Sequence, residues 1–155
     1  MRWRISPVLT GPLVTVLGGM AVVLGALLPW SATPFDDGIT QYWTVFDLHR
    51  YDPHWSGVPP VVAVLCLICG VVLIGIGCLR AVRPRIGARW IIVVLGAATF
   101  GVATWSIFPI IALWHTHLHM PQTGIEPISY GLIVTMCGGI YAVLGGLLDS
   151  DNESS

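Results

Sequence analysis

The chain has 155 residues, of which 55 % are hydrophobic and only 10 % are charged. A water-soluble domain carries about 25 % charged residues, so this sequence lacks the polar side chains that a water-facing surface requires. The formal net charge of −1 gives no electrostatic basis for binding nucleic acid. Composition therefore predicts one compact membrane unit whose main partner is the lipid bilayer.

Four apolar stretches without charged residues predict membrane spans at about 8–30, 60–79, 90–114 and 128–148. Each approaches or exceeds the roughly 20 residues that a helix needs to cross a bilayer. Backbone groups in lipid must bond within their own segment, so the spans are expected to be helices. The predicted fold class is all-α, a four-helix transmembrane bundle. Its single domain covers residues 1–148 and precedes a short acidic tail at 149–155.

The arginines predict the orientation of this bundle. Only Arg50 lies between the first and second spans, whereas the other six basic residues precede the first span or lie around the connection between the second and third: Arg2, Arg4, Arg80, Arg83, Arg85 and Arg89. Positive residues favour the cytoplasmic side. Both termini and the acidic tail are therefore expected in the cytoplasm of a cell (plasma) membrane protein.

The outer side is predicted to carry a connection of 28 residues, 31–58, rich in aromatic side chains and aspartates. Residues 40–46 favour a short strand or an interfacial segment. Amphipathic rings prefer the membrane boundaries. We expect Trp30, Trp55, Trp114 and Tyr130 near the outer boundary.

Glycines recur every seven residues in three of the predicted spans. Such spacing keeps one small face toward a partner helix, where backbones can approach closely in lipid. The pattern predicts a tightly packed bundle, and the alternative is an oligomer interface on one of these faces. The residues are Gly11, Gly18, Gly25, Gly70, Gly77, Gly131, Gly138 and Gly145.

The first and last spans also resemble each other in sequence. Thr15–Leu28 (TVLGGMAVVLGALL) and Thr135–Leu148 (TMCGGIYAVLGGLL) share eight of fourteen residues. The two spans cross the membrane in opposite directions, and inverted repeats build some transporters. Shared glycine, valine and leucine composition explains the same match without a repeat.

The second outer connection contains the candidate metal ligands His115, His117, His119 and Met120. In an extended segment the alternate histidines share one face, whereas in a helix His115 and His119 share one. Imidazole groups bind zinc or copper, and a thioether favours Cu(I). The alternatives are a metal or pH sensor and an ordinary polar loop at the membrane surface.

No Asp, Glu, Lys, Arg or His lies within any predicted span, which argues against proton or ion transport through the bundle. Cys66 and Cys69 have the spacing of a redox motif, but their position inside the second span favours a packing role. The sequence contains no nucleophile–base pair, phosphate loop or dinucleotide fingerprint. These features predict a protein that is not an enzyme and has no cofactor.

The end of the first span, GALLPW at residues 25–30, resembles uncharacterised small four-helix membrane proteins of actinobacteria that carry an LPW element after the first helix. The resemblance implies a cell-membrane location and no established activity. The leading functional prediction is a non-enzymatic accessory or scaffold partner of a larger membrane assembly, with a membrane-protein partner or a second copy. The alternatives are an outer-face metal or pH sensor using His115–His119 and a small oligomeric transporter.

Overall fold

The computed structural model describes residues 7–34, 40–47, 58–83, 87–117 and 128–148. Its elements in chain order are α1 (Pro7–Leu27), β1 (Ser31–Pro34), β2 (Thr40–Trp43), α3 (Pro60–Val82), α4 (Arg89–His117) and α5 (Tyr130–Leu148). All four long helices are long and apolar enough to cross a membrane. The predicted number, order and approximate position of the helices are therefore confirmed.

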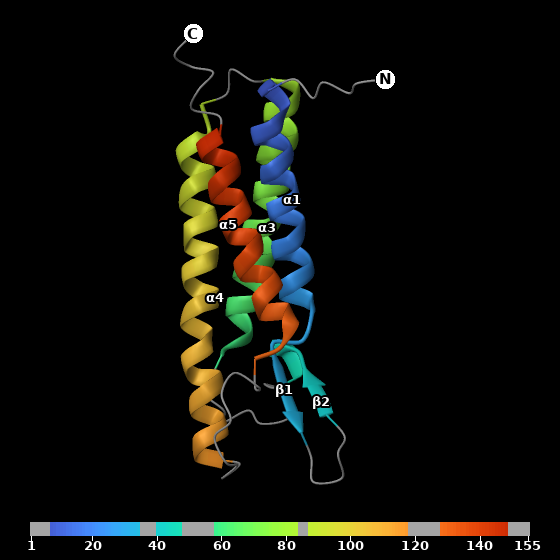
Figure 1. Cartoon of the computed structure of the whole chain (residues 1–155), viewed down its shortest axis with the longest axis vertical. Helices are drawn as coiled ribbons and strands as arrows, with labels where there is room; N and C mark the ends of the chain where they lie inside the picture. The colour runs from blue at the N-terminus through green and yellow to red at the C-terminus, as the bar shows by residue number, and fades with distance from the viewer. Residues whose placement is uncertain (1–6, 35–39, 48–57, 84–86, 118–127, 149–155) are drawn as a thin grey trace.

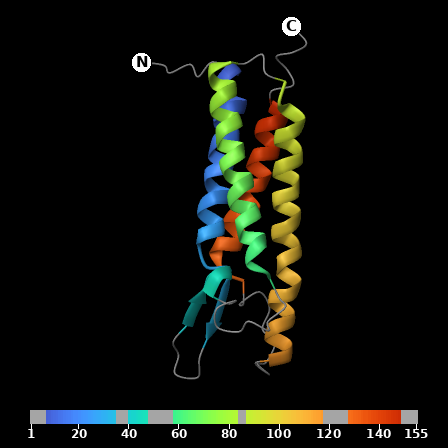
Figure 2. The same cartoon turned by 180° about the vertical axis from the view of Figure 1, so that it is seen from behind.

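In the order α3, α1, α5, α4, each helix runs antiparallel to its neighbours, and α3 also contacts α4, so the four helices form a bundle (Figures 1 and 2). Helices α1 and α5 pack closely in the middle, while α3 lies on α1 and α4 lies on α5. The arginine end is the end of the bundle that contains the first residues of α1 and α4 and the last residues of α3 and α5. The opposite end, beside β1 and β2, is the hairpin end (Figure 1).

The central pair is nearly symmetric about a twofold axis perpendicular to the helices. Thr15 lies against Gly145, and the equivalent Thr135 lies against Gly25. The flanking helices obey the same symmetry, because buried positions of α3 recur 26 residues later in α4. The α3 positions are Cys66, Gly70, Leu73, Gly77 and Arg80, and their α4 counterparts are Ile92, Gly96, Thr99, Ala103 and Ser106.

This symmetry matches the sequence similarity between the first and last spans, but it does not have the order of a tandem repeat. It relates α1 to α5 and α3 to α4, so the first helix pair maps onto the second in reversed chain order. Duplication of a two-helix unit would instead relate α1 to α4 and α3 to α5. We therefore attribute the symmetry to equivalent packing of small residues on both sides of the central pair.

The connection after α1 contains a small two-stranded sheet, whereas the described chain is otherwise mostly helical. Strands β1 and β2 pair antiparallel, with Ser31 opposite Trp43. The expected strand at 40–46 ends at Trp43, and a helical turn follows at 45–47. Thr44 caps this turn, because its hydroxyl accepts a hydrogen bond from the Asp47 amide (3.2 Å) while the Asp47 carboxylate accepts the Thr44 hydroxyl proton (2.6 Å).

Helix α4 extends well beyond the other helices at the hairpin end (Figures 1 and 2). Gly139 of α5 packs on Gly96 of α4. Counting nine residues along each antiparallel helix from this contact brings the start of α5, Tyr130, level with Trp105. The remaining twelve residues of α4 add ~18 Å. Trp105 is therefore level with the start of α5, and Trp114, which was expected near the outer boundary, lies nine residues further along α4.

Candidate functional site

The heptad glycines pack inside the chain. A Cβ atom added to Gly18 would lie 2.7 Å from the Ala142 nitrogen and 2.8 Å from the Gly138 oxygen, and one added to Gly138 would lie 2.7 Å from the Val22 nitrogen. The backbones of α1 and α5 are thus in direct contact along this face. Gly11, Gly25, Gly131 and Gly145 belong to the same helix interface, since each contributes an atom to such a contact or meets one.

The α3 glycines serve the adjoining interface. Cβ atoms added at Gly70 and Gly77 would meet Val23 and Val16 of α1, at 2.7 Å in each case. The heptad spacing does not include the second glycine of the three Gly-Gly pairs: Gly19 packs α1 on α3, while Gly139 and Gly146 pack α5 on α4. The Gly-Gly pairs were the sequence signal for this second interface, because adjacent residues of a helix face two different neighbouring helices. An oligomer interface therefore has to use another surface.

Four buried hydroxyl groups of the helices α1, α4 and α5 form hydrogen bonds within their own helix. The side chains of Thr15 and Thr135 donate to the carbonyl oxygens of Gly11 (3.0 Å) and Gly131 (2.9 Å). Thr99 and Ser106 donate to carbonyls four residues earlier in α4. Such bonds remove the cost of placing a polar group in an apolar interior. These hydroxyl groups are therefore compatible with a packed core.

The predicted spans 60–79 and 90–114 contain no charged residue, whereas the longer helices of the structure include Arg80 and Arg89. Helix α3 continues past residue 79, and Arg80 in its last turn is 5 % exposed, with Nε and Nη1 fully buried. Arg89 begins α4, and its guanidinium carbon lies 5.2 Å from the ring centre of Trp90, within cation–π range. Cys66 and Cys69 lie inside α3 as free thiols, the first buried and the second half-buried.

Pro29 and Trp30 connect three parts of the hairpin end. The buried Trp30 indole donates to the Gly25 carbonyl (2.8 Å). The Trp30 amide donates to the Trp43 carbonyl (2.9 Å), and the Trp30 carbonyl accepts from the Ser129 amide (3.0 Å). The LPW element thus ties the end of α1 to β2 and to the segment that precedes α5.

The histidine candidates are placed only in part. His115 and His117 belong to the last turn of α4, so the backbone of this pair is helical and not extended. His119 and Met120 lie outside the described residues. Within the part of the chain that the structure describes, no group of three His, Cys, Asp or Glu side chains is placed to hold a metal ion.

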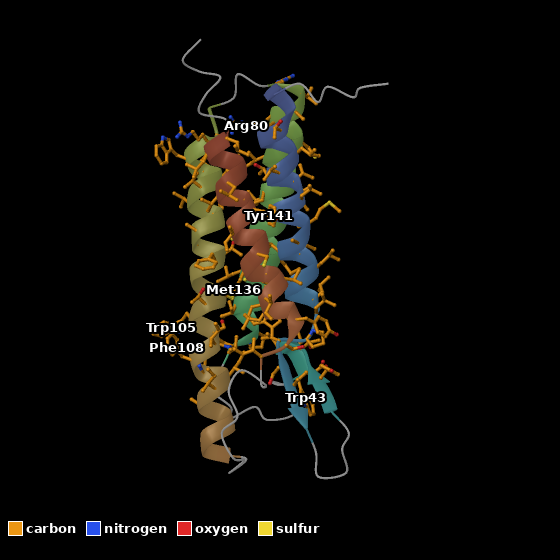
Figure 3. All side chains as sticks on the ribbon, in the orientation of Figure 1. Trp43, Arg80, Trp105, Phe108, Met136 and Tyr141 are labelled. Carbon is orange, nitrogen blue, oxygen red and sulfur yellow. The ribbon has the colours of Figure 1, made fainter. Side chains whose placement is uncertain are left out.

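The outward face of α4 exposes large apolar side chains next to small residues. Val94, Trp105 and Phe108 expose 62 %, 72 % and 66 % of their surface. Figure 3 shows the last two pointing away from the bundle, with ring centres 6.1 Å apart. Between them and Val94 lie the exposed small residues Ala97, Ala98 and Gly101, and a Cβ atom at Gly101 would meet nothing within 4 Å.

Each of these exposed residues of α4 lies three or four positions from another member of the set, so together they occupy one helix face. We call this surface, formed by Val94, Ala97, Ala98, Gly101, Trp105 and Phe108, the α4 outward face. Its small residues form a low region next to two protruding rings, an arrangement typical of helix contacts in lipid. The Ala97-x-x-x-Gly101 spacing was the sequence signal for it, but the heptad glycines were more conspicuous.

Comparison of the chain with protein-family models, with curated proteins and with solved structures finds no match. The fold and the contacts described above therefore carry the functional argument.

Proposed function

We propose that the chain is a non-enzymatic multi-pass membrane protein that acts as an accessory or scaffold partner of a larger membrane assembly. The observation that carries the proposal is the α4 outward face. All the heptad glycines are used within the chain, whereas Gly101 keeps an open approach to the α4 backbone. A partner helix can pack closely there, and close packing is a main source of helix association in lipid.

The aromatic rings add a depth marker to this surface. Trp105 and Phe108 lie level with the start of α5, where the hairpin begins (Figure 3). Tryptophan prefers the boundary between the hydrocarbon core and water. A partner helix that contacts Gly101 in the hydrocarbon core would reach these rings at the boundary, so one helix face provides both packing and vertical alignment.

The proposed location is the cell membrane, with the arginine end in the cytoplasm. Arg80, Arg83 and Arg89 lie at this end of the described structure. Positive residues next to spans are retained on the cytoplasmic side. The hairpin and the extension of α4 beyond Trp105 then face the outer compartment, where they enlarge the surface available to a partner.

Two glycine substitutions test the proposal with a matched control. Gly101 on α4 and Gly75 on α3 are both exposed, and a Cβ atom at either would meet nothing within 4 Å. Gly101→Leu and Gly75→Leu should therefore both fold. We expect the wild-type chain and Gly75→Leu to co-purify a specific membrane protein from native membranes after mild solubilisation. Gly101→Leu should lose at least roughly tenfold of that recovery, equivalent to about 1.4 kcal/mol.

The outcome is read by mass spectrometry and by two differently tagged copies of the chain, which detect self-association. Equal recovery with Gly101→Leu would show that the α4 outward face is not the contact. Recovery of no stoichiometric protein with any of the three chains would contradict the accessory role itself.

A further inference from the structure

Arg89 is a charged side chain that the packing of the bundle places at the first residue of α4. A Cβ atom added at Gly146 of α5 would lie 3.3 Å from the Arg89 carbonyl oxygen, so the backbone here lies against the last turn of α5. The Arg89 side chain is half-buried, and its Nε atom is buried without a hydrogen-bond partner in the described part of the chain. A buried donor is costly unless an acceptor reaches it.

The neighbouring Trp90 ring contacts this cation. The Arg89 guanidinium carbon lies 5.2 Å from the centre of the Trp90 ring, and Trp90 itself is 67 % exposed. Contact with an aromatic ring leaves the planar N–H fork of a guanidinium free to form two parallel hydrogen bonds to an oxyanion. The pair therefore combines a fork of charged donors with an exposed aromatic ring.

The first turn of α4 adds main-chain donors next to this cation. The Ile92 amide bonds the Ala88 carbonyl (3.1 Å), but the amides of Trp90 and Ile91 come too early in the helix to have an acceptor within it. Ala88 stands at the capping position and has no side-chain oxygen to accept from them. The positive end of the α4 dipole thus coincides with Arg89, and both favour an anion.

The depth of Arg89 in the bundle selects the kind of anion. Gly146, which packs on the Arg89 carbonyl, is only two residues from the end of α5 at Leu148. Arg89 therefore lies where the apolar helices end, at the depth that phospholipid head groups occupy. One turn deeper on α4, Ile91 and Val94 expose 54 % and 62 % of their surface, which suits acyl chains. An anion at Arg89 is thus expected to carry a hydrocarbon chain.

We propose that Arg89, Trp90 and the first turn of α4 form a binding site for the phosphate of an anionic phospholipid. The phosphate oxygens accept from the Arg89 fork and from the first amides of α4, while an acyl chain follows Ile91 and Val94 into the hydrocarbon core. Charge-assisted bonds to a phosphate are stronger than bonds between neutral groups, and basic sites at the ends of membrane helices bind anionic head groups in this way.

The test measures lipid binding to the full chain in an uncharged detergent by native mass spectrometry. The probes are phosphatidylglycerol and, as a lipid without net charge, phosphatidylcholine with the same acyl chains. The wild-type chain should bind phosphatidylglycerol more tightly, and Arg89→Gln should raise the dissociation constant for phosphatidylglycerol by roughly tenfold. The matched control is Arg83→Gln, which removes the same charge from an exposed position at the end of α3 and should raise it by less than about twofold at physiological salt.

Three outcomes would overturn the proposal. Equal affinity of the wild-type chain for the two lipids would show that the negative charge of the lipid is not recognised. Equal losses with Arg89→Gln and Arg83→Gln would show diffuse attraction to this end of the bundle and no built site. Displacement of phosphatidylglycerol by millimolar inorganic phosphate would identify a soluble anion as the ligand, whereas a site for a lipid phosphate should retain most of its lipid.

Fluorescence quenching provides a measurement that needs no substitution at Arg89. The difference in quenched fluorescence between the wild-type chain and Trp90→Phe reports the lipid in contact with Trp90, whose exposed position should tolerate the change. This difference should be larger with brominated phosphatidylglycerol than with brominated phosphatidylcholine at the same mole fraction. Equal differences for the two lipids would contradict the proposal even if Arg89→Gln fails to fold.

Discussion

The contact between α1 and α5 makes a quantitative prediction for Gly18→Ala. The added Cβ atom would lie 2.7 Å from the Ala142 nitrogen and 2.8 Å from the Gly138 oxygen. Both are backbone atoms, so no side chain can turn aside, and an ordinary contact of about 3.5 Å requires the helices to separate by ~0.8 Å. A gap of that size costs a quarter to a half of the dispersion energy at the contact.

We expect Gly18→Ala to lower the free energy of unfolding by about 1–3 kcal/mol, the usual cost of overpacking. Alanine is a better helix former than glycine by about 1 kcal/mol, which makes the control informative. Gly101→Ala adds the same methyl group where nothing lies within 4 Å, and it should be neutral or stabilising. The readout is unfolding in a mixed detergent series, followed by tryptophan fluorescence.

The symmetric position strengthens the test. Gly138→Ala should cost about as much as Gly18→Ala, because its Cβ atom would meet the equivalent Val22 nitrogen at 2.7 Å. The double variant should cost less than the sum, since the first substitution has already separated the helices. A Gly18→Ala chain as stable as Gly101→Ala would refute the close backbone packing on which this reasoning rests.

Three further predictions concern the hairpin end and the orientation. Trp30→Phe should lower the free energy of unfolding by about 1–3 kcal/mol, because the Gly25 carbonyl loses its buried donor; an unchanged denaturation midpoint would contradict this. In a zinc titration by calorimetry, any binding should weaken more with His115→Ala or His119→Ala than with His117→Ala, because residues four apart share a helix face and residues two apart do not. Equal losses with all three variants would favour an extended segment. A reporter that is active only in the cytoplasm, fused after residue 155, should be active, and activity of a periplasmic reporter there instead would reverse the proposed orientation.

The sequence by itself determined the number and the approximate limits of the helices. Hydropathy and length are properties of a continuous stretch, so the positions of four spans can be read without knowing what each contacts. The glycine spacing likewise identified faces suited to close packing. It did not identify the partners, because Gly18 and Gly70 look alike in sequence although one packs on α5 and the other on α1.

Only the tertiary structure decided features that depend on how the helices are placed side by side. Trp105 is the tryptophan of α4 that lies level with the start of α5, because the contact of Gly96 with Gly139 fixes the level of α4 against α5. Arg80 became a buried charge because α3 continues through the end of the bundle instead of stopping at the last apolar residue. The α4 outward face became a candidate contact surface because the heptad glycines are covered by neighbouring helices, whereas Gly101 is open beside the exposed rings of Trp105 and Phe108. A local pattern records which faces suit packing, whereas the arrangement of whole helices decides which of them remain available.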